Sequence, residues 1–196
     1  PGGSSVIDLG AGTIMAIAAL KMLTLDSSDA RRDAGIEPVV LAEKEGLALI
    51  NGTDGMLGML CLALNDLDLL VTTADLAAAA SVEALTGTDA VFAADLQALR
   101  PHPGQERSAS NMRRVLDGST LIRRPREGEF TRVQDAYSLR CAPQVHGAVR
   151  DTADHAARVA SIELRSAIDN PVVLDDGRVE SNGNFHGAPV AYVLDF

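Results

Sequence analysis

Residues 56–86 read "MLGMLCLALNDLDLLVTTADLAAAASVEALT", a run whose only charged residues are Asp66, Asp68, Asp75 and Glu83. Such sparse polarity over many helical turns predicts one long helix that is buried on nearly every side, as in the centre of a helix bundle. The chain is 46% hydrophobic but only 3% aromatic, with no Trp. A core of Ala, Leu, Val and Ile favours closely packed helices, so the sequence predicts an all-α fold.

Shorter elements are expected on both sides of this helix. A Gly/Pro break at Pro171 and a turn at Asp176-Gly177 predict one small β-hairpin, and Asn51-Gly52 suits a tight turn with positive φ. Residues 120–132 form a charged loop, and the segment from residue 133 starts irregular and turns helical. Helices are expected within residues 10–24, 39–53, 86–105 (ended by Pro101 and Pro103), 106–119 and 151–168, with a last one from about Ala188.

The charge and composition exclude several classes of protein. A net charge of −10 argues against a surface for nucleic acid or for anionic membranes. The longest uncharged stretches, residues 9–20 and 55–65, are shorter than the ~20 residues that a bilayer span needs, and no signal peptide is visible. Cys61 and Cys141 lie in apolar surroundings, which is typical of reduced core thiols. We therefore expect a cytoplasmic protein without nucleic-acid or membrane partners.

Both ends of the sequence look cut. The chain opens on "PGGSSVIDLG" without an initiator Met and stops at "VAYVLDF", inside an apolar helical pattern. We therefore expect residues 1–196 to be the central part of one helical domain, truncated at both ends.

The stretch "VQDAYSLRCAPQVHGA", residues 133–148, carries the first candidate for chemistry. On a helix, residues three apart share a face, so Tyr137 and Arg140 are expected to lie together. A guanidinium beside a phenol favours the phenolate, which can act as a base, and Arg140 can alternatively clamp a carboxylate. The pair suits proton removal from an amino or hydroxy acid. The competing interpretation is a turn-capping Tyr and a structural ion pair.

Further polar residues have a functional and a structural interpretation each. Asn51 could hold a substrate or cofactor oxygen, or it could be a plain turn residue. Gln134 could extend the face of Tyr137 or cap the incoming segment. His146 could carry a proton or be a hydrogen-bonded core histidine. No two histidines stand at metal-ligand spacing, so no metal site is expected.

The loop "GNFHG", residues 183–187, is the last candidate. Its flanking glycines allow close approach to a ligand. Phe185 could then be a pocket wall, with His186 as a proton carrier and Asn184 beside them. The alternative is an anchored loop whose imidazole is hydrogen-bonded.

Five motifs in order, "EGLALINGT", "RPHPGQ", "QDAYSLRCAPQVHGA", "AIDNPVVL" and "SNGNFHGAPVAYVLDF", closely resemble the histidine ammonia-lyase family. This family also contains tyrosine and phenylalanine ammonia-lyases and aminomutases. The resemblance runs from about Glu37 to Phe196, and the histidine in "QVHGA" favours the histidine branch. It implies a long-helix bundle of the fumarase/aspartase-like type, assembled as a homotetramer whose active sites combine several subunits. The implied reaction is elimination of ammonia from an amino acid, which gives urocanate from histidine.

The resemblance also implies roles for individual residues. Tyr137 matches the catalytic tyrosine of the family, and Arg140 matches the arginine that binds the substrate carboxylate. Asn51 and Gln134 match polar groups around the cofactor and the substrate, and Phe185 matches a residue that lines the pocket. The implied partner is therefore a small amino-acid substrate.

One departure concerns the family's electrophile, 4-methylideneimidazole-5-one (MIO), which forms when an Ala-Ser-Gly tripeptide cyclises. Alignment on Asp8-Leu9 leaves Ser5-Val6-Ile7 in its place. Val6 and Ile7 replace the serine that dehydrates and the glycine whose nitrogen attacks, and β-branched side chains obstruct the tight turn. The chain is then a homologue without lyase activity, a fragment recorded without a modified residue, or a subunit that another chain complements.

Three hypotheses for function follow. The first is an ammonia-lyase acting on histidine, the second a non-catalytic or truncated homologue that serves as a scaffold or ligand-binding subunit, and the third a tyrosine ammonia-lyase or aminomutase. The nearly all-apolar stretch from Met56 to Leu64 would leave a large exposed patch on a monomer, so we also expect a homo-oligomer.

Overall fold

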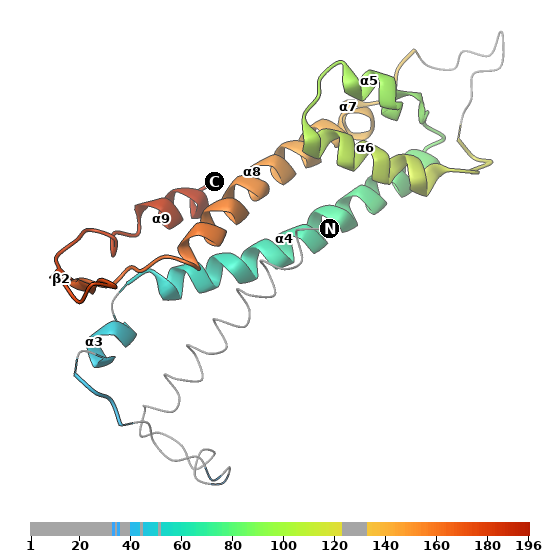
Figure 1. Cartoon of the computed structure of the whole chain (residues 1–196). Helices are drawn as coiled ribbons and strands as arrows, with labels where there is room; N and C mark the ends of the chain where they lie inside the picture. Colours follow the sequence, from blue (N-terminus) through green and yellow to red (C-terminus); the bar gives the residue numbers. More distant parts are fainter. Residues whose placement is uncertain (1–32, 34, 36–39, 44, 51, 123–132) are drawn as a thin grey trace. The chain divides into compact units, whose positions relative to one another are not determined.

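The computed structural model describes residues 33, 35, 40–43, 45–50, 52–122 and 133–196 (Figure 1). The expected helix within residues 10–24, the Ser5-Val6-Ile7 stretch and Asn51 lie outside these residues. Apart from one two-stranded sheet, the regular elements of the described part are helical, which confirms the predicted all-α class. The chain divides into two units, residues 1–65 with 155–196 and residues 66–154.

Helix α4 (Asp54–Ala84) has 31 residues and confirms the long helix expected from the opening motif. Asp54 stands in its first turn, where a negative charge complements the partial positive charge of the helix N-terminus. Gly87 closes the C-terminal end by donating its N–H to the carbonyl of Val82 at 2.7 Å. This follows Thr86, whose φ of 51° reverses the chain.

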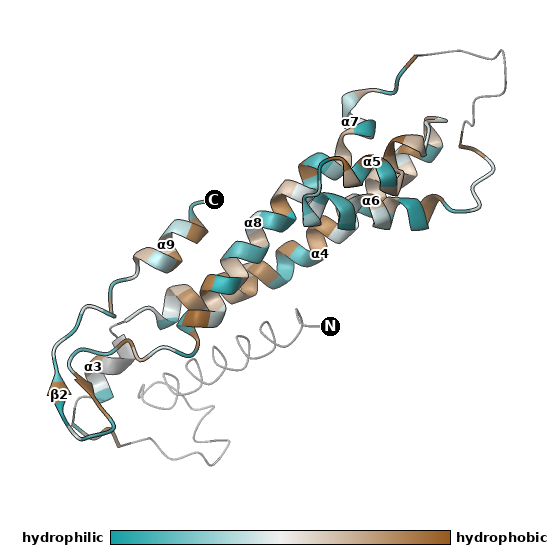
Figure 2. Ribbon diagram, turned by 45° about the horizontal axis from the view of Figure 1, so that its top comes forward, coloured by the Kyte–Doolittle hydropathy of each residue, from teal (hydrophilic) through white to brown (hydrophobic). Residues whose placement is uncertain are grey.

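The expectation that α4 is buried on nearly every side is wrong for this chain. Brown bands recur along α4 in Figure 2, and the neighbouring elements leave part of its apolar surface uncovered. Several large apolar side chains are therefore exposed, namely Met59, Leu62, Leu69, Leu70, Leu76 and Leu85.

Within the described residues, α4 is also the one helix that is long and apolar enough to cross a membrane. The core helix of a bundle passes the same test of length and composition. The carboxylate of Asp75, in the middle of α4, is buried and paired with Arg150 inside the protein, which fits a bundle core.

The first unit contains α3 (Glu45–Ile50), the beginning of α4, the end of α8 (Ala142–Glu163) and α9 (Ala188–Leu194). Gly52, just before α4, has φ 110°, which confirms the positive φ expected at this position of the Asn51-Gly52 turn. The buried Thr53 donates its hydroxyl to Glu163 Oε2 at 3.2 Å and so ties the two helices together. The core of this unit consists of Leu57, Leu60, Cys61, Ala156, Ala160 and Val190.

The predicted hairpin is also present. Strands β1 (Val172–Val173) and β2 (Val179–Glu180) pair antiparallel, with Val173 opposite Val179. Gly177 has φ 83° in the turn, a conformation that L side chains rarely adopt. The hairpin confirms the turn expected at Asp176-Gly177.

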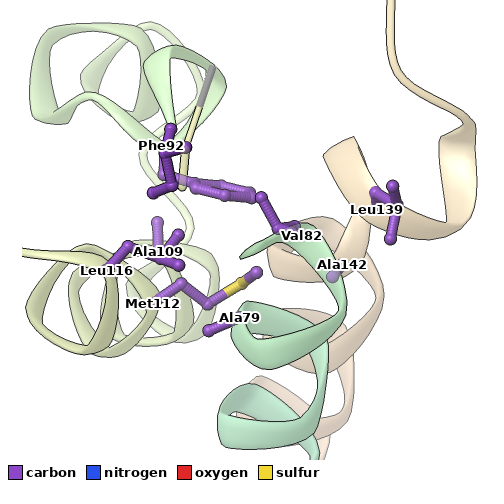
Figure 3. Packing of buried hydrophobic residues seen from close by; sticks show 9 residues of the cluster. Ala79, Val82, Phe92, Ala109, Met112, Leu116, Leu139 and Ala142 are labelled. Carbon is purple, nitrogen blue, oxygen red and sulfur yellow. The ribbon is translucent and has the colours of Figure 1, made fainter. Parts of the chain in front are cut away.

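The second unit contains the rest of α4 and α8 together with a 3₁₀ turn, η1 (Ala90–Phe92), and the helices α5 (Ala94–Ala98), α6 (Pro103–Leu116) and α7 (Tyr137–Arg140). Its core forms where α4, α6, η1 and α8 meet, with Met112 and Phe92 fully buried (Figure 3). The cluster comprises Ala79, Val82, Phe92, Ala109, Met112, Leu116, Ile122, Leu139 and Ala142.

Three boundaries differ from those expected. The single helix expected within residues 86–105 is wrong, because the extended backbone of Ala93 separates η1 from α5. Pro103 does not end a helix but begins α6, since proline fits a first helical turn whose N–H groups have no helical partner. The helix expected from residue 151 begins at Ala142 and ends at Glu163, before Ile168.

A glycine pair brings α6 close to α8. A Cβ on Gly104 would overlap the carbonyl of Gly147, and a Cβ on Gly147 would overlap the backbone of Gln105. Asp151 of α8 fixes the contact by accepting the N–H of Gly104 at 2.7 Å. Any side chain at either glycine would push the two helices apart.

Candidate active site

Three of the predicted site residues lie together at α7, within the second unit. The guanidinium of Arg140 lies over the ring of Tyr137, 4.5 Å from its centre, which is cation–π geometry. Nη2 of Arg140 donates to Oε1 of Gln134 at 2.8 Å. The expectation that Tyr137 and Arg140 share a face is therefore confirmed, and Gln134 extends that face.

The same residues are open to solvent. Tyr137 is 72% exposed and Gln134 is exposed, while Arg140 is half-buried. Nε of Arg140 donates to the backbone carbonyl of Asp135 at 3.0 Å. A phenol, a guanidinium and an amide thus form one accessible polar surface, which can bind a carboxylate and exchange a proton with a ligand.

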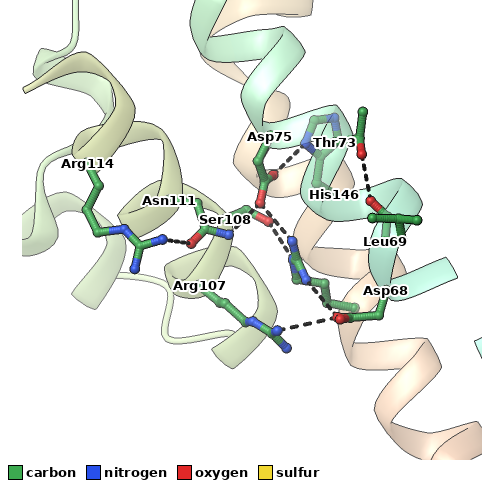
Figure 4. Close-up of polar contacts among 10 residues, drawn as sticks. Asp68, Leu69, Thr73, Asp75, Arg107, Ser108, Asn111, Arg114 and His146 are labelled. Carbon is green, nitrogen blue, oxygen red and sulfur yellow. Dashed lines mark hydrogen bonds and ion pairs between the residues drawn. The ribbon is translucent and has the colours of Figure 1, made fainter. Parts of the chain in front are cut away.

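His146 has a different environment. Its Nδ1 lies 2.8 Å from Oδ1 of Asp75, a carboxylate that is 1% exposed. Oδ2 of the same carboxylate accepts from Nη2 of Arg150 at 2.8 Å and from Nδ2 of Asn111 at 2.8 Å (Figure 4). This contact fits the interpretation of His146 as a hydrogen-bonded structural histidine, and its role as a proton carrier stays a prediction.

Arg150 is the second centre of this buried network. It is 4% exposed, and its Nε donates to the hydroxyl of Ser108 at 3.1 Å. Its Nη1 lies 3.6 Å from Asp68, which also pairs with Arg107 at 3.3 Å near the surface. The network connects α4, α6 and α8 within the second unit and fixes their register.

The environment of Asp75 lowers the pKa of its carboxyl below the ordinary value. Burial by itself raises that pKa. Hydrogen bonds from Asn111, His146 and Arg150, with the positive charge of Arg150, outweigh burial. Asp75 is therefore held as a carboxylate inside the helix bundle.

The second group of predicted residues belongs to the first unit, in the loop before α9. Asn184 donates Nδ2 to the carbonyl of Ala167 at 3.2 Å and its N–H to Asn182 Oδ1 at 2.8 Å. Nδ1 of His186 accepts the N–H of Ala188 at 3.3 Å, at the first turn of α9. Both side chains thus anchor the loop, whereas Phe185 is 45% exposed and available as a wall.

Asn51 lies outside the described residues, so its part in the site stays a prediction. The meeting of the Phe185 loop with the Tyr137–Arg140 pair also stays a prediction, because the two groups belong to different units.

Three side chains that sequence reasoning missed stand out. Asp75 appeared only as one polar break in an apolar helix, although a lone charge in such a helix predicts a buried partner. Its partner Arg150 had no signal in the sequence, because nothing there shows which helices are neighbours. Gln144 Oε1 is a buried acceptor without a hydrogen-bond donor among the residues that the structure describes.

No group of three or more His, Cys, Asp or Glu in the described part is arranged to hold a metal ion. Cys61 and Cys141 are free thiols, and burial raises the pKa of Cys61.

Comparison with known proteins supplies the family. The model of the family described as aromatic amino acid lyase matches residues 9–196. This chain belongs to the aromatic amino acid lyase family. The match confirms the resemblance that the five motifs indicated.

Individual relatives of this lyase-family chain agree with that assignment. Histidine ammonia-lyase of Streptomyces griseus is 70% identical over 162 residues, covering 83% of this chain and 31% of the relative. The structure of a tyrosine aminomutase from Streptomyces globisporus has a TM-score of 0.79 at 37% identity, covering 87% of this chain and 36% of that one. A histidine ammonia-lyase from Trypanosoma cruzi has a TM-score of 0.71 at 39% identity, with coverages of 85% and 30%.

The chain therefore spans about a third of the length of the relatives that it matches. Lyases of this family act on amino acids, are typically oligomeric and typically use MIO. The family match begins at residue 9, after Ser5-Val6-Ile7, so the expectation that these three residues replace the MIO tripeptide stays a prediction.

Proposed function

We propose that this chain forms the tyrosine–arginine wall of an active site that eliminates ammonia from L-histidine to give urocanate. The observation that carries the proposal is the cluster of Gln134, Tyr137 and Arg140 on one accessible surface. The 70% identity to a histidine ammonia-lyase supports histidine as the substrate.

The chemistry of the wall follows from its three side chains. Elimination breaks a C–H bond at the β-carbon and the C–N bond at the α-carbon, and the electron pair of the C–H bond becomes the new C=C bond. The nitrogen leaves with the C–N pair as ammonia. The phenolic oxygen of Tyr137 takes the β-proton, and the planar fork of Arg140 holds the substrate carboxylate through paired hydrogen bonds.

Gln134 and Asn51 complete the polar surroundings. Gln134 already accepts from Arg140, so it orients the guanidinium and leaves its own amide N–H groups for the substrate. For Asn51 and Phe185 we keep the roles that the family resemblance implies, a polar group near the cofactor and a residue that lines the pocket.

The residues of this chain do not fit the formation of MIO. No serine in the 196 residues is followed by glycine, and we infer from alignment on Asp8-Leu9 that Ser5-Val6-Ile7 occupies the place of the tripeptide. We therefore propose that a second, MIO-forming chain completes the site, and we derive no step through the group. A complementing assembly also accounts for Leu69, Leu70 and Leu76, which α4 leaves exposed.

The missing tripeptide equally favours a second candidate, a non-catalytic homologue that retains the helical scaffold for assembly or ligand binding. The aminomutase neighbour favours a third, action on tyrosine. In each case we propose a cytoplasmic homo- or hetero-oligomer that contacts neither membrane nor nucleic acid. We propose a tetramer, as the resemblance to the histidine ammonia-lyase family implies.

One experiment separates these candidates. The chain is assayed with L-histidine and with L-tyrosine, first alone and then mixed with the Streptomyces griseus relative whose tyrosine aligned with Tyr137 is replaced by Phe. We expect no product from the chain alone and urocanate from the mixture. Urocanate from the chain alone would contradict the need for a second chain. Product from tyrosine but not from histidine would favour the third candidate. If neither the chain alone nor the mixture gives a product, the second candidate, a non-catalytic scaffold, is the one that remains.

In the active mixture, Arg140→Lys is expected to raise KM for histidine roughly 10- to 100-fold, because losing one charge-assisted hydrogen bond costs about 1.5–3 kcal/mol. Lysine keeps the charge but not the fork, so kcat should fall much less. Steady-state kinetics provides the measurement, with the exposed Arg178→Lys as a matched control. An unchanged KM would show that Arg140 does not bind the carboxylate.

A further inference from the structure

The segment that carries the proposed site is held from two sides within the second unit. Helix α7 has only four residues, and no side chain caps its N-terminus. So short a helix does not hold its own conformation, because nucleation of a helical turn is unfavourable. Leu139 anchors its C-terminal half by packing into the buried cluster with Val82 and Ala142.

Asp135 anchors the other half. This residue is 7% exposed, and its Oδ2 accepts the backbone N–H of Thr88 at 2.8 Å. Thr88 belongs to the chain reversal after α4. In this reversal Gly87 packs closely against Asp135 and Val82, since an added Cβ would lie 3.0 Å from Oδ2 of Asp135 and 3.0 Å from Val82. The carboxylate thus fastens residues 133–140 to the C-terminal turn of a 31-residue helix.

The same residue touches the site through its backbone. Its carbonyl accepts Nε of Arg140 at 3.0 Å, while Gln134, the residue before it, accepts Nη2 at 2.8 Å. Two acceptors from neighbouring residues therefore set the plane of one guanidinium. That plane lies over the ring of Tyr137.

From these contacts we propose that Asp135 is a positioning residue, whose carboxylate, bound to the Thr88 N–H, fixes the backbone that orients Arg140 over Tyr137. Asp135 acts on the site through Arg140, whose Nε binds its backbone carbonyl. The kinetic consequence rests on the proposed function, whereas the geometric consequence does not.

The test uses the full chain with Asp135→Ala and Asp135→Asn. The Asn side chain keeps an oxygen that accepts the Thr88 N–H, whereas Ala has none. In ¹⁵N-edited NMR, we expect the Nε–H of Arg140 to exchange with solvent at least 10-fold faster in the Ala variant. The Asn variant should stay within about 3-fold of the wild type. Backbone N–H groups of Met112 and Val82 report on the core and should keep their protection in both variants.

A matched control is Asp95→Ala, which removes an exposed carboxylate of α5 whose Oδ1 accepts the N–H of its neighbour Leu96. Unchanged exchange at Arg140 in Asp135→Ala would overturn the proposal. A loss of exchange protection throughout the core of Asp135→Ala would also overturn the proposal, because it would show that Asp135 is needed for folding. The Asp135→Asn variant would then show whether folding requires the negative charge.

The kinetic arm uses the mixture with the Streptomyces griseus relative. Asp135→Ala should raise KM for histidine at least 10-fold with a smaller change in kcat, and Asn should restore KM. If the wild-type mixture gives no urocanate, the proposed function fails while the exchange measurement still decides the role of Asp135. If urocanate forms but KM in Asp135→Ala is unchanged, the positioning role fails while the proposed function stands.

Discussion

Asp75→Ala is expected to destabilise the protein by about 3–5 kcal/mol, because it breaks a buried ion pair from one side. The remaining guanidinium of Arg150 is 4% exposed and would keep only the Ser108 hydroxyl at 3.1 Å and the more distant Asp68 carboxylate at 3.6 Å. Asn111 and His146 would also lose their acceptor. Urea unfolding at neutral pH, followed by circular dichroism, measures the change in the free energy of unfolding.

Two controls isolate the buried pair. Asp68→Ala removes a carboxylate that is largely exposed and faces the same Arg150, so a change of about 0–1 kcal/mol is expected. The double variant Asp75→Leu/Arg150→Met replaces both charges by apolar groups and should be more stable than Asp75→Ala alone. Equal destabilisation by Asp68→Ala and Asp75→Ala would show that burial does not determine the effect.

The contribution of Asp75 should also depend on pH. Its pKa in the folded chain lies below the ordinary value of about 3.9, because hydrogen bonds and the charge of Arg150 outweigh burial. A group with a lowered folded pKa stabilises the folded state fully above its unfolded pKa, and that contribution is lost as the pH falls through the folded pKa. The difference in unfolding free energy between wild type and Asp75→Asn should therefore shrink below about pH 4.

Local pattern was sufficient for much of the fold. The apolar run predicted α4 to within two residues at each end, and Asp176-Gly177 predicted the hairpin. The boundary at Pro103 was wrong because proline can either end a helix or occupy its first turn. From the sequence, Pro103 was expected to end a helix, whereas it begins α6. Exposure along α4 was wrong because periodicity reports which residues are apolar, and the partners that cover them are not in the sequence.

In the second unit, too, some contacts could be predicted from local spacing and others could not. Tyr137 and Arg140 could be paired from their spacing, because helical neighbours three apart share a face. Asp75 with Arg150 and Asp135 with Thr88 could not, since these contacts join residues 75 and 47 positions apart in the chain. Finding such pairs requires knowing which helices are neighbours, and no local pattern contains that information.

Tyr137→Phe is expected to lower kcat for histidine in the mixed assembly by roughly 10²- to 10⁴-fold, the usual contribution of a general base. Only the phenolic oxygen is lost. The phenyl ring still offers its face to the guanidinium of Arg140, which lies 4.5 Å from the ring centre. Since Tyr137 is 72% exposed, the free energy of unfolding should change by less than about 0.5 kcal/mol.

The other tyrosine of the chain provides the matched control. Tyr192 is exposed on α9, and Tyr192→Phe removes the same atom from the first unit. Turnover by Tyr192→Phe should equal that of the wild type, whereas Tyr137→Phe should bind histidine with nearly unchanged KM because Arg140 stays in place. Normal turnover in Tyr137→Phe would remove Tyr137 as the base. It would leave Arg140 as a carboxylate anchor on a surface that needs its proton acceptor from another chain.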